Sequence, residues 1–128
     1  MVTTSGHFLE KDMIHIESKI QQSCVTWFRH QYPDYILFAI PNGGKRGKIE
    51  ASIMKGEGVL AGVADLFFAM PSGVSHGLFI EIKTEKGRQS NSQKIFEEKA
   101  LMIGYDYKIC RSMDEFIIVI NDYLLSNM

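Results

Sequence analysis

The segment GVADLFFAMPSGVSHGLFIEIKT, residues 62–84, places three charged side chains where the pattern is otherwise that of two apolar strands. Asp65 opens the first run, and Glu81 and Lys83 lie inside the second. Because side chains alternate between the two faces of a strand, Glu81 and Lys83 share one face. If the two runs pair as an antiparallel hairpin, the start of the first opposes the end of the second. We therefore expect Asp65 beside Glu81 and Lys83.

This trio of charges is costly to bury unless a cation compensates for it. Two carboxylates repel each other in a low-dielectric environment, and one ammonium group does not neutralise both. A divalent metal ion does. A few carboxylate oxygens, with coordination sites left for water and phosphate, favour Mg²⁺ or Mn²⁺ over Zn²⁺. The alternative is a salt-bridged patch at the edge of the sheet, but a constellation of three such residues favours the metal site.

A third carboxylate, Glu17, is a further candidate for this site. Residues 12–31 have the apolar spacing of a helix, and Glu17 shares a face with Ile20, Cys24 and Phe28. An acid on an inward face needs a partner. Alternatively, Glu17 lies at the margin of the apolar stripe, near the solvated first turn where acids interact well with the helix dipole. The two interpretations carry equal weight.

Hydrophobic periodicity and turn residues predict an α/β chain. Apolar residues at helical spacing alternate with short β-branched and aromatic runs, and Pro, Gly and Ser fill the turns. Asp12 is expected to cap the first helix, and Ser112 with Glu115 to form a capping box at the last. The expected elements are, in order, a helix over 12–31, a strand over 35–40, a short helix over 48–56, hairpin strands over 63–70 and 77–83, a helix over 91–103, a strand over 105–110 and a final helix from 112.

Three of these helices carry apolar faces that are expected to pack against the sheet. The face of the first helix consists of Ile16, Ile20, Cys24, Trp27 and Phe28. The face of the helix over 91–103 consists of Ile95, Phe96, Ala100 and Ile103, and Gly104 is placed to end it. The face of the last helix consists of Phe116, Val119, Ile120 and Tyr123.

Length and composition limit the class of protein. With 128 residues, 45% hydrophobic and 23% charged, the chain suits a single domain spanning 1–128. A net charge of −1 excludes a uniformly basic nucleic-acid-binding surface, while local basic patches stay possible. Without a signal-peptide pattern or a membrane-length apolar run, we expect a soluble, cytoplasmic protein with no membrane partner. Cys24 and Cys110 are expected to be buried, reduced thiols, since neither belongs to a CxxC pair.

The order Asp65, then Glu81-Ile82-Lys83, resembles the signature of PD-(D/E)XK nucleases. The stretches IPNGGKRG, GVADL, EIKTEKGRQSNSQ and GY resemble the VRR-NUC family within that superfamily. Ala64 departs from the pattern, which has proline there; proline holds the backbone but supplies no ligand. The resemblance implies a restriction-endonuclease-like α/β core, α-β-β-β-α-β, with a mixed central sheet flanked by helices and an extra C-terminal helix.

The resemblance also implies a set of metal ligands. Asp65 and Glu81 would bind Mg²⁺ or Mn²⁺, and the backbone carbonyl of Ile82 would complete the protein ligands. Glu17 corresponds to the helix-one acid of the superfamily, which places it among the metal-binding or catalytic groups.

Two more residues acquire catalytic roles from the resemblance. Lys83 would position or help deprotonate the attacking water and offset charge on the phosphate. Gln93 corresponds to the glutamine that follows the core strand and would orient groups around the site. Its spacing from Ser90 also fits a capping box at a helix start, and both roles are compatible.

Basic loops lie on both sides of the candidate site in the sequence. NGGKRGK at 42–48 and KTEKGR at 83–88 supply backbone amides and cationic side chains suited to phosphate contacts. The alternative for each lysine by itself is ordinary solvated charge. The candidate DNA contacts are Asn42, Lys45, Arg46, Lys48, Lys86 and Arg88.

We therefore expect a metal-dependent DNA endonuclease. A small domain favours recognition of backbone shape, and stand-alone members of the family resemble Holliday-junction resolvases, which implies branched DNA and a homodimer. Alternatives are a restriction- or repair-type nuclease for flaps or linear duplex, a non-catalytic DNA-binding module with a nuclease fold, and RNA as substrate. The apolar residues of the last helix that form a candidate dimer surface, unless they pack on the sheet, are Ile117, Ile118, Tyr123, Leu124 and Leu125.

Overall fold

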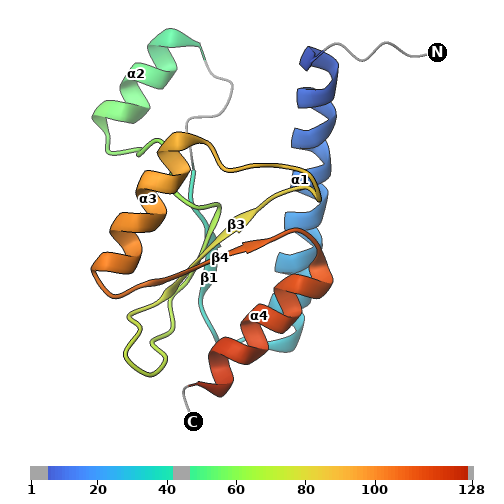
Figure 1. Cartoon of the computed structure of the whole chain (residues 1–128), viewed down its shortest axis with the longest axis vertical. Helices are drawn as coiled ribbons and strands as arrows, with labels where there is room; N and C mark the ends of the chain where they lie inside the picture. The colour runs from blue at the N-terminus through green and yellow to red at the C-terminus, as the bar shows by residue number, and fades with distance from the viewer. Residues whose placement is uncertain (1–5, 42–46, 127–128) are drawn as a thin grey trace, which may run out of the picture.

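The computed structural model describes residues 6–41 and 47–126, with the side chains of 6–11 left out (Figure 1). It confirms an α/β fold with helices on both sides of a four-stranded sheet. The elements are, in order, α1 (Gly6–Gln31), β1 (Leu37–Ala39), α2 (Lys48–Gly56), β2 (Leu66–Phe68), β3 (Leu78–Ile82), α3 (Asn91–Met102), β4 (Asp106–Cys110) and α4 (Met113–Leu125).

The sheet is mixed, as the sequence predicts. Its strand order is β1-β2-β3-β4, with β1–β2 and β2–β3 antiparallel and β3–β4 parallel. Leu66 pairs with Ile80, so the residue before β2, Asp65, is brought opposite Glu81. The expected hairpin is therefore present, and it positions the two acids.

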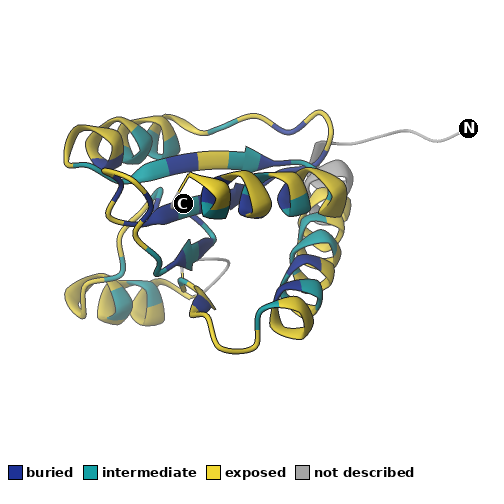
Figure 2. Cartoon of the chain, turned by 90° about the horizontal axis from the view of Figure 1, so that it is seen from below, coloured by how far each residue is buried: buried dark blue, intermediate teal, exposed yellow. Residues whose placement is uncertain are grey.

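One face of the sheet packs against α1 and α4. Figure 2 shows the buried residues on the strands and on the helix sides that face them. Burying a side chain of the size of Phe or Ile stabilises the fold by about 1.5–3 kcal/mol, so this layer is the main source of stability. The fully or nearly fully buried side chains in it are Cys24 and Phe28 of α1, Leu66, Phe68, Leu78, Ile80 and Ile82 of the strands, and Phe116 and Ile120 of α4.

The opposite face carries an aromatic row that α3 covers in part. The Phe79 ring meets Phe96 of α3 edge-on at 4.9 Å and Phe67 at 4.6 Å between ring centroids. Phe38 of β1 continues the row but is 45% exposed. Glu81 and Tyr107 lie on this same face, so α3 packs beside the candidate site.

The residues that were predicted to begin and end α3 and to begin α4 do lie at those helix ends. Ser90 and Gln93 form a reciprocal capping box at the start of α3. Gly104, with φ of +98°, follows its end. Ser112 accepts a hydrogen bond from the Glu115 N–H, but the Glu115 carboxylate accepts from the N–H of Arg111, so only half of the predicted capping box forms.

Several expectations about element ends and faces are wrong. α1 begins at Gly6, so Asp12 lies inside the helix and does not cap it. Ile16 is 49% exposed, whereas the next residue, Glu17, is partly buried, so the inward side of this part of α1 carries the acid and not the isoleucine. Ile95 and Ile103 are 53% and 65% exposed. The sheet-facing side of α3 carries Gln93, Phe96, Glu97 and Ala100 at helical spacing, so polar residues occupy positions that the apolar pattern had assigned to Ile95 and Ile103.

The last helix packs on the body of the protein. Tyr123 is buried and Leu124 contacts the core, which is the alternative to a dimer surface considered above. Ile118 and Leu125 remain 59% and 62% exposed. Cys24 and Cys110 are buried free thiols, as expected. Within the described part of the chain, no helix is both long and apolar enough to cross a membrane.

Candidate active site

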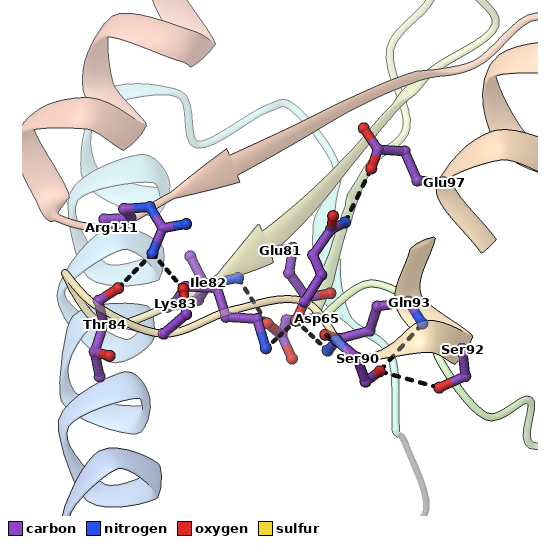
Figure 3. A network of polar contacts seen from close by, with 12 residues as sticks. Asp65, Glu81, Ile82, Lys83, Thr84, Ser90, Ser92, Gln93, Glu97 and Arg111 are labelled. Atoms are coloured by element: carbon purple, nitrogen blue, oxygen red, sulfur yellow. Dashed lines mark hydrogen bonds and ion pairs between the residues drawn. The ribbon is translucent and has the colours of Figure 1, made fainter. Parts of the chain in front are cut away.

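Asp65 and Glu81 come together where the hairpin strands approach α3 (Figure 3). The backbone N–H of Ile82 donates a hydrogen bond to Oδ2 of Asp65 at 2.7 Å, which fixes this carboxylate against β3. The two carboxyl groups lie within hydrogen-bonding reach of each other. The structure therefore brings together the two acids that the sequence predicts to be neighbours.

The Glu81 side chain is almost fully enclosed, with 2% of the residue exposed. Its Oε2 accepts a hydrogen bond from Nε2 of Gln93 at 2.8 Å, and its Oε1 accepts one from the Tyr107 hydroxyl at 3.3 Å. Nζ of Lys83 lies 3.9 Å from Oε2. Lys83 is itself 9% exposed, so this ion pair is shielded from water.

Burial disfavours the ionised form of both acids. Burial and the nearby Asp65 carboxylate together raise the pKa of Glu81 to about 8, against the opposing charge of Lys83. Burial also raises the pKa of Asp65, against the hydrogen bond from the Ile82 N–H. Without a cation the pair holds a proton on Glu81 near neutral pH. A divalent ion at the same place would replace that proton.

Glu17 approaches the site from α1. Burial raises the pKa of its half-buried carboxyl group, the charge of Lys83 opposes this, and the charge of Asp65 adds to it. These interactions place Glu17 in the electrostatic environment of the acid pair, as one of the two sequence interpretations expects. Within residues 6–41 and 47–126, however, no three His, Cys, Asp or Glu side chains form a ready metal-binding group. Asp65 and Glu81 are therefore the carboxylate donors in direct contact.

This donor set fits a hard divalent cation. Mg²⁺ is commonly held by one or two carboxylates and completes its octahedron with water and phosphate oxygens. Asp65 and Glu81 supply two oxygen donors, and no cysteine or histidine accompanies them in the contacts described above. The donor chemistry suits Mg²⁺ or Mn²⁺ better than Zn²⁺.

Gln93 completes the capping box of α3 and also contacts Glu81. Its Oε1 accepts a hydrogen bond from the Ser90 N–H at 2.8 Å, which completes the capping box, and its Nε2 donates to Glu81. Since the Ser90 N–H can only donate, the oxygen of the Gln93 amide faces Ser90 and its nitrogen faces Glu81. The first turn of α3 is thus tied directly to the acid pair.

Gly62 brings the segment that carries Asp65 onto α3. Its φ is +83°, and a Cβ there would lie 2.3 Å from the backbone oxygen of Ser92. Only glycine permits this close approach of two backbones. The contact joins the start of the Asp65 strand to the helix turn that carries Gln93.

A tyrosine that sequence reasoning missed completes the surroundings of Glu81. The Tyr107 hydroxyl donates to Glu81 and accepts from Nε2 of Gln89 at 3.3 Å, and the same Nε2 donates to Oε1 of Glu97 at 2.9 Å. Strand alternation in YDYKIC shows that Tyr105 and Tyr107 share a face. The parallel register of β3 and β4 is needed to show that Tyr107 and Glu81 lie on the same face of the sheet, because Tyr107 pairs with Phe79, which shares a face with Glu81.

Arg111 was also missed, and it organises the loop after β3. Its guanidinium donates to the carbonyls of Thr84 and Gly87 at 2.7 Å each and to that of Glu85 at 3.3 Å (Figure 3). This loop carries Lys86 and, just after it, Arg88, and both are exposed. Arg111 therefore holds a cationic loop next to the site through three backbone carbonyls.

The other predicted DNA contacts divide into two groups. Lys48 is exposed at the start of α2, a helix in which no residue is buried and which stands apart from the sheet in Figure 1. Asn42, Lys45 and Arg46 lie outside the described residues.

The fold resembles that of a known protein. A solved structure described as a "VRR_NUC domain protein" superposes with a TM-score of 0.76 at 28% sequence identity, covering 88% of this chain and 90% of that chain. No protein-family model matches the sequence, and no curated protein matches it significantly.

Proposed function

Because the chain belongs to the VRR-NUC family, we propose that it is a metal-dependent nuclease that hydrolyses phosphodiester bonds in DNA. The observation that carries this proposal is the contact between Asp65 and Glu81, two acids whose pKa values are both raised by burial, beside Lys83. Such a pair is unfavourable in a purely structural role and becomes favourable when it holds a cation.

Each of these residues has a separate role in the proposed reaction. Asp65 and Glu81, with the Ile82 carbonyl, would hold Mg²⁺ or Mn²⁺, which supplies Lewis acidity and a more acidic bound water. Lys83 orients the attacking water and offsets charge on the scissile phosphate. Gln93 fixes the Glu81 carboxylate.

Glu17, in the field of Lys83 and Asp65, acts on this site from α1. Glu17 is only half-buried, and the described residues contain no group of three acids close enough to share a metal ion. A catalytic or water-binding role therefore fits Glu17 better than that of a direct metal ligand.

Backbone contacts would bring DNA to this site. The exposed charges of Lys86 and Arg88 lie on the loop that Arg111 holds, and Lys48 begins α2. We assign to these residues, together with Asn42, Lys45 and Arg46, contacts to DNA phosphates.

We further propose that the substrate is branched DNA such as a Holliday junction. Phosphate contacts alone do not distinguish base sequences, so selectivity would come from the shape of the DNA. Resolving a junction requires a pair of symmetric cuts, which a twofold homodimer with one active site per chain provides.

The test is a cleavage assay with Mg²⁺ or Mn²⁺ on four-way junctions, flaps, linear duplex and single-stranded RNA. Wild type should cut the four-way junction fastest, and EDTA should abolish the reaction. Asp65→Ala and Lys83→Ala should each lose at least about 100-fold in rate, since each removes a group in contact with the reacting centre. Lys108→Ala, an exposed lysine on β4, is the matched control and should cut normally.

Other outcomes would redirect the proposal. Faster cleavage of flaps or linear duplex would identify a restriction- or repair-type nuclease, and faster cleavage of RNA a ribonuclease. Junction binding that Asp65→Ala leaves intact, without cleavage by wild type under any metal condition, would identify a DNA-binding module and contradict the catalytic proposal.

A further inference from the structure

The hydroxyl of Tyr107 is the innermost polar group that contacts the acid pair from β4. Tyr107 is 6% exposed, and its ring packs against Phe96 with centroids 6.2 Å apart. Its hydroxyl reaches Oε1 of Glu81, the carboxylate oxygen that Gln93 does not occupy. Each oxygen of Glu81 thus has one donor of its own, one from α3 and one from β4.

The direction of the hydrogen bond from Tyr107 is set by a chain of partners. The Glu97 carboxylate only accepts, so the amide of Gln89 must turn its nitrogen toward it. That same nitrogen then donates its other proton to the Tyr107 oxygen. The Tyr107 proton is left to point at Glu81. The chain Glu97–Gln89–Tyr107–Glu81 therefore has one consistent arrangement of donors and acceptors.

We propose that Tyr107 is a positioning residue for the metal ligand Glu81, and that Gln89 and Glu97 fix the direction in which it acts. This inference rests on the metal site proposed above. With one donor on each oxygen, the Glu81 carboxylate cannot rotate freely, and its remaining lone pairs stay directed toward Asp65. Partners that orient a metal ligand in this way typically change metal affinity or activity by 10- to 100-fold when they are removed.

A purely structural role for Tyr107 makes a different prediction. Tyr107→Phe keeps the ring and its contact with Phe96 and removes only the hydroxyl. If the ring alone matters, this variant binds metal as wild type does. The matched control is Tyr123→Phe, because the Tyr123 hydroxyl also makes hydrogen bonds, to the Met70 carbonyl and Ser75, but within the α4 layer on the other side of the sheet.

The experiment is titration of the full-length chain with Mn²⁺ by isothermal calorimetry, without DNA. Tyr107→Phe should raise the Kd for Mn²⁺ by about 10-fold. Tyr123→Phe should lower thermal stability but leave the Kd within twofold. Glu97→Gln should raise the Kd to a smaller extent, because a glutamine at this position no longer forces the orientation of Gln89. The double variant should bind no more weakly than Tyr107→Phe alone, since both act through one chain of hydrogen bonds.

The outcomes separate this inference from the proposed function. No Mn²⁺ binding by wild type would overturn both. Binding by wild type with an unchanged Kd for Tyr107→Phe would overturn the positioning role and leave the metal site intact. Should Tyr107→Phe fail to fold, Glu97→Gln decides, and a wild-type Kd for that variant would also overturn the inference.

Discussion

Glu81 is the residue at which the polar contacts of the site converge. Its two oxygens accept from Gln93 and Tyr107, Nζ of Lys83 lies 3.9 Å from Oε2, and Asp65 lies against it. Ionisation of Glu81 is unfavourable here, because the group is buried and the Asp65 carboxylate lies beside it. Either a proton or a bound cation would remove this unfavourable charge, so we expect protonation and the proposed metal binding to compete at this position.

This competition predicts an unusual pH dependence for the metal-free protein. The folded-state pKa of Glu81, about 8, lies above its ordinary value of 4.5, so the folded state binds the proton more tightly than the unfolded state. The resulting stability is fully present below the unfolded pKa and is lost as the pH rises through about 8. Between pH 6 and 8, wild type in EDTA should lose about 2 kcal/mol, or roughly 5–10 °C in Tm.

Glu81→Gln isolates this effect, because it cannot ionise. Its Tm in EDTA should vary little over the same pH range and should exceed that of wild type at pH 8. Glu98→Gln, an exposed glutamate on α3, is the matched control and should keep the wild-type slope. Equal pH slopes for Glu81→Gln and wild type would contradict the assigned burial of the pair.

At the scale of elements, much of the arrangement follows from the sequence. Strand alternation and a hairpin suffice to place Asp65 near Glu81 and Lys83, and the S-x-x-Q spacing marks the start of α3. The role of Tyr107 could not be predicted, because β4 follows a helix and its register with β3 is set only by the tertiary fold. The side chain of Arg111 likewise acts on a loop more than twenty residues earlier, and no local pattern indicates that contact.

The junction between the Asp65 segment and α3 can be tested at Gly62. Gly62→Ala would force a side chain against the Ser92 backbone in a left-handed conformation, and we expect a loss of about 2–4 kcal/mol in unfolding free energy together with slower cleavage. Gly58→Ala is the matched control, because Gly58 has φ of +106° but no atoms within 4 Å of a Cβ. It should cost about 1 kcal/mol and leave cleavage unchanged. Equal effects of the two changes in chemical denaturation would show that the close contact is not needed.

The loop after β3 depends on Arg111. Arg111→Met removes the donors to three carbonyls, so backbone amides at 85–88 should exchange with deuterium about 10-fold faster, and DNA affinity should fall several-fold. Arg29→Met, an exposed arginine of α1, should change neither quantity. Unchanged exchange at 85–88 in hydrogen–deuterium mass spectrometry would mean that the loop is held by other contacts.

At the scale of the whole molecule, α1 and α3 lie on either side of the acid pair, and the sheet joins them (Figure 3). The inner layer of the fold could be predicted because apolar spacing identifies Cys24, Phe28, Phe116 and Ile120. The exposure of Ile95 and Ile103 could not be predicted, because α3 directs Gln93 and Glu97 toward the site and leaves these two isoleucines facing solvent. The hydrogen bonds of Gln93 and Glu97 therefore determine which side of α3 faces the sheet, and the apolar spacing alone would predict a different side.

The homodimer proposed for junction cleavage makes a prediction about α4. If the exposed Ile118 and Leu125 contribute to the interface, wild type should have twice the chain mass of 14.5 kDa by light scattering. Ile118→Glu should then give a monomer that nicks one strand of a junction and no longer makes paired cuts. Ile53→Glu, an equally exposed isoleucine on α2, is the control. A monomeric wild type that makes paired cuts would contradict this assembly.

The central claim is that Asp65 and Glu81 hold one hard cation between them. Crystals soaked in Mn²⁺, with diffraction measured at the manganese absorption edge, test it most directly. We predict an anomalous peak roughly 2.0–2.3 Å from an oxygen of each carboxylate, which disappears in Asp65→Ala. Manganese bound elsewhere, or in contact with neither acid, would contradict the account.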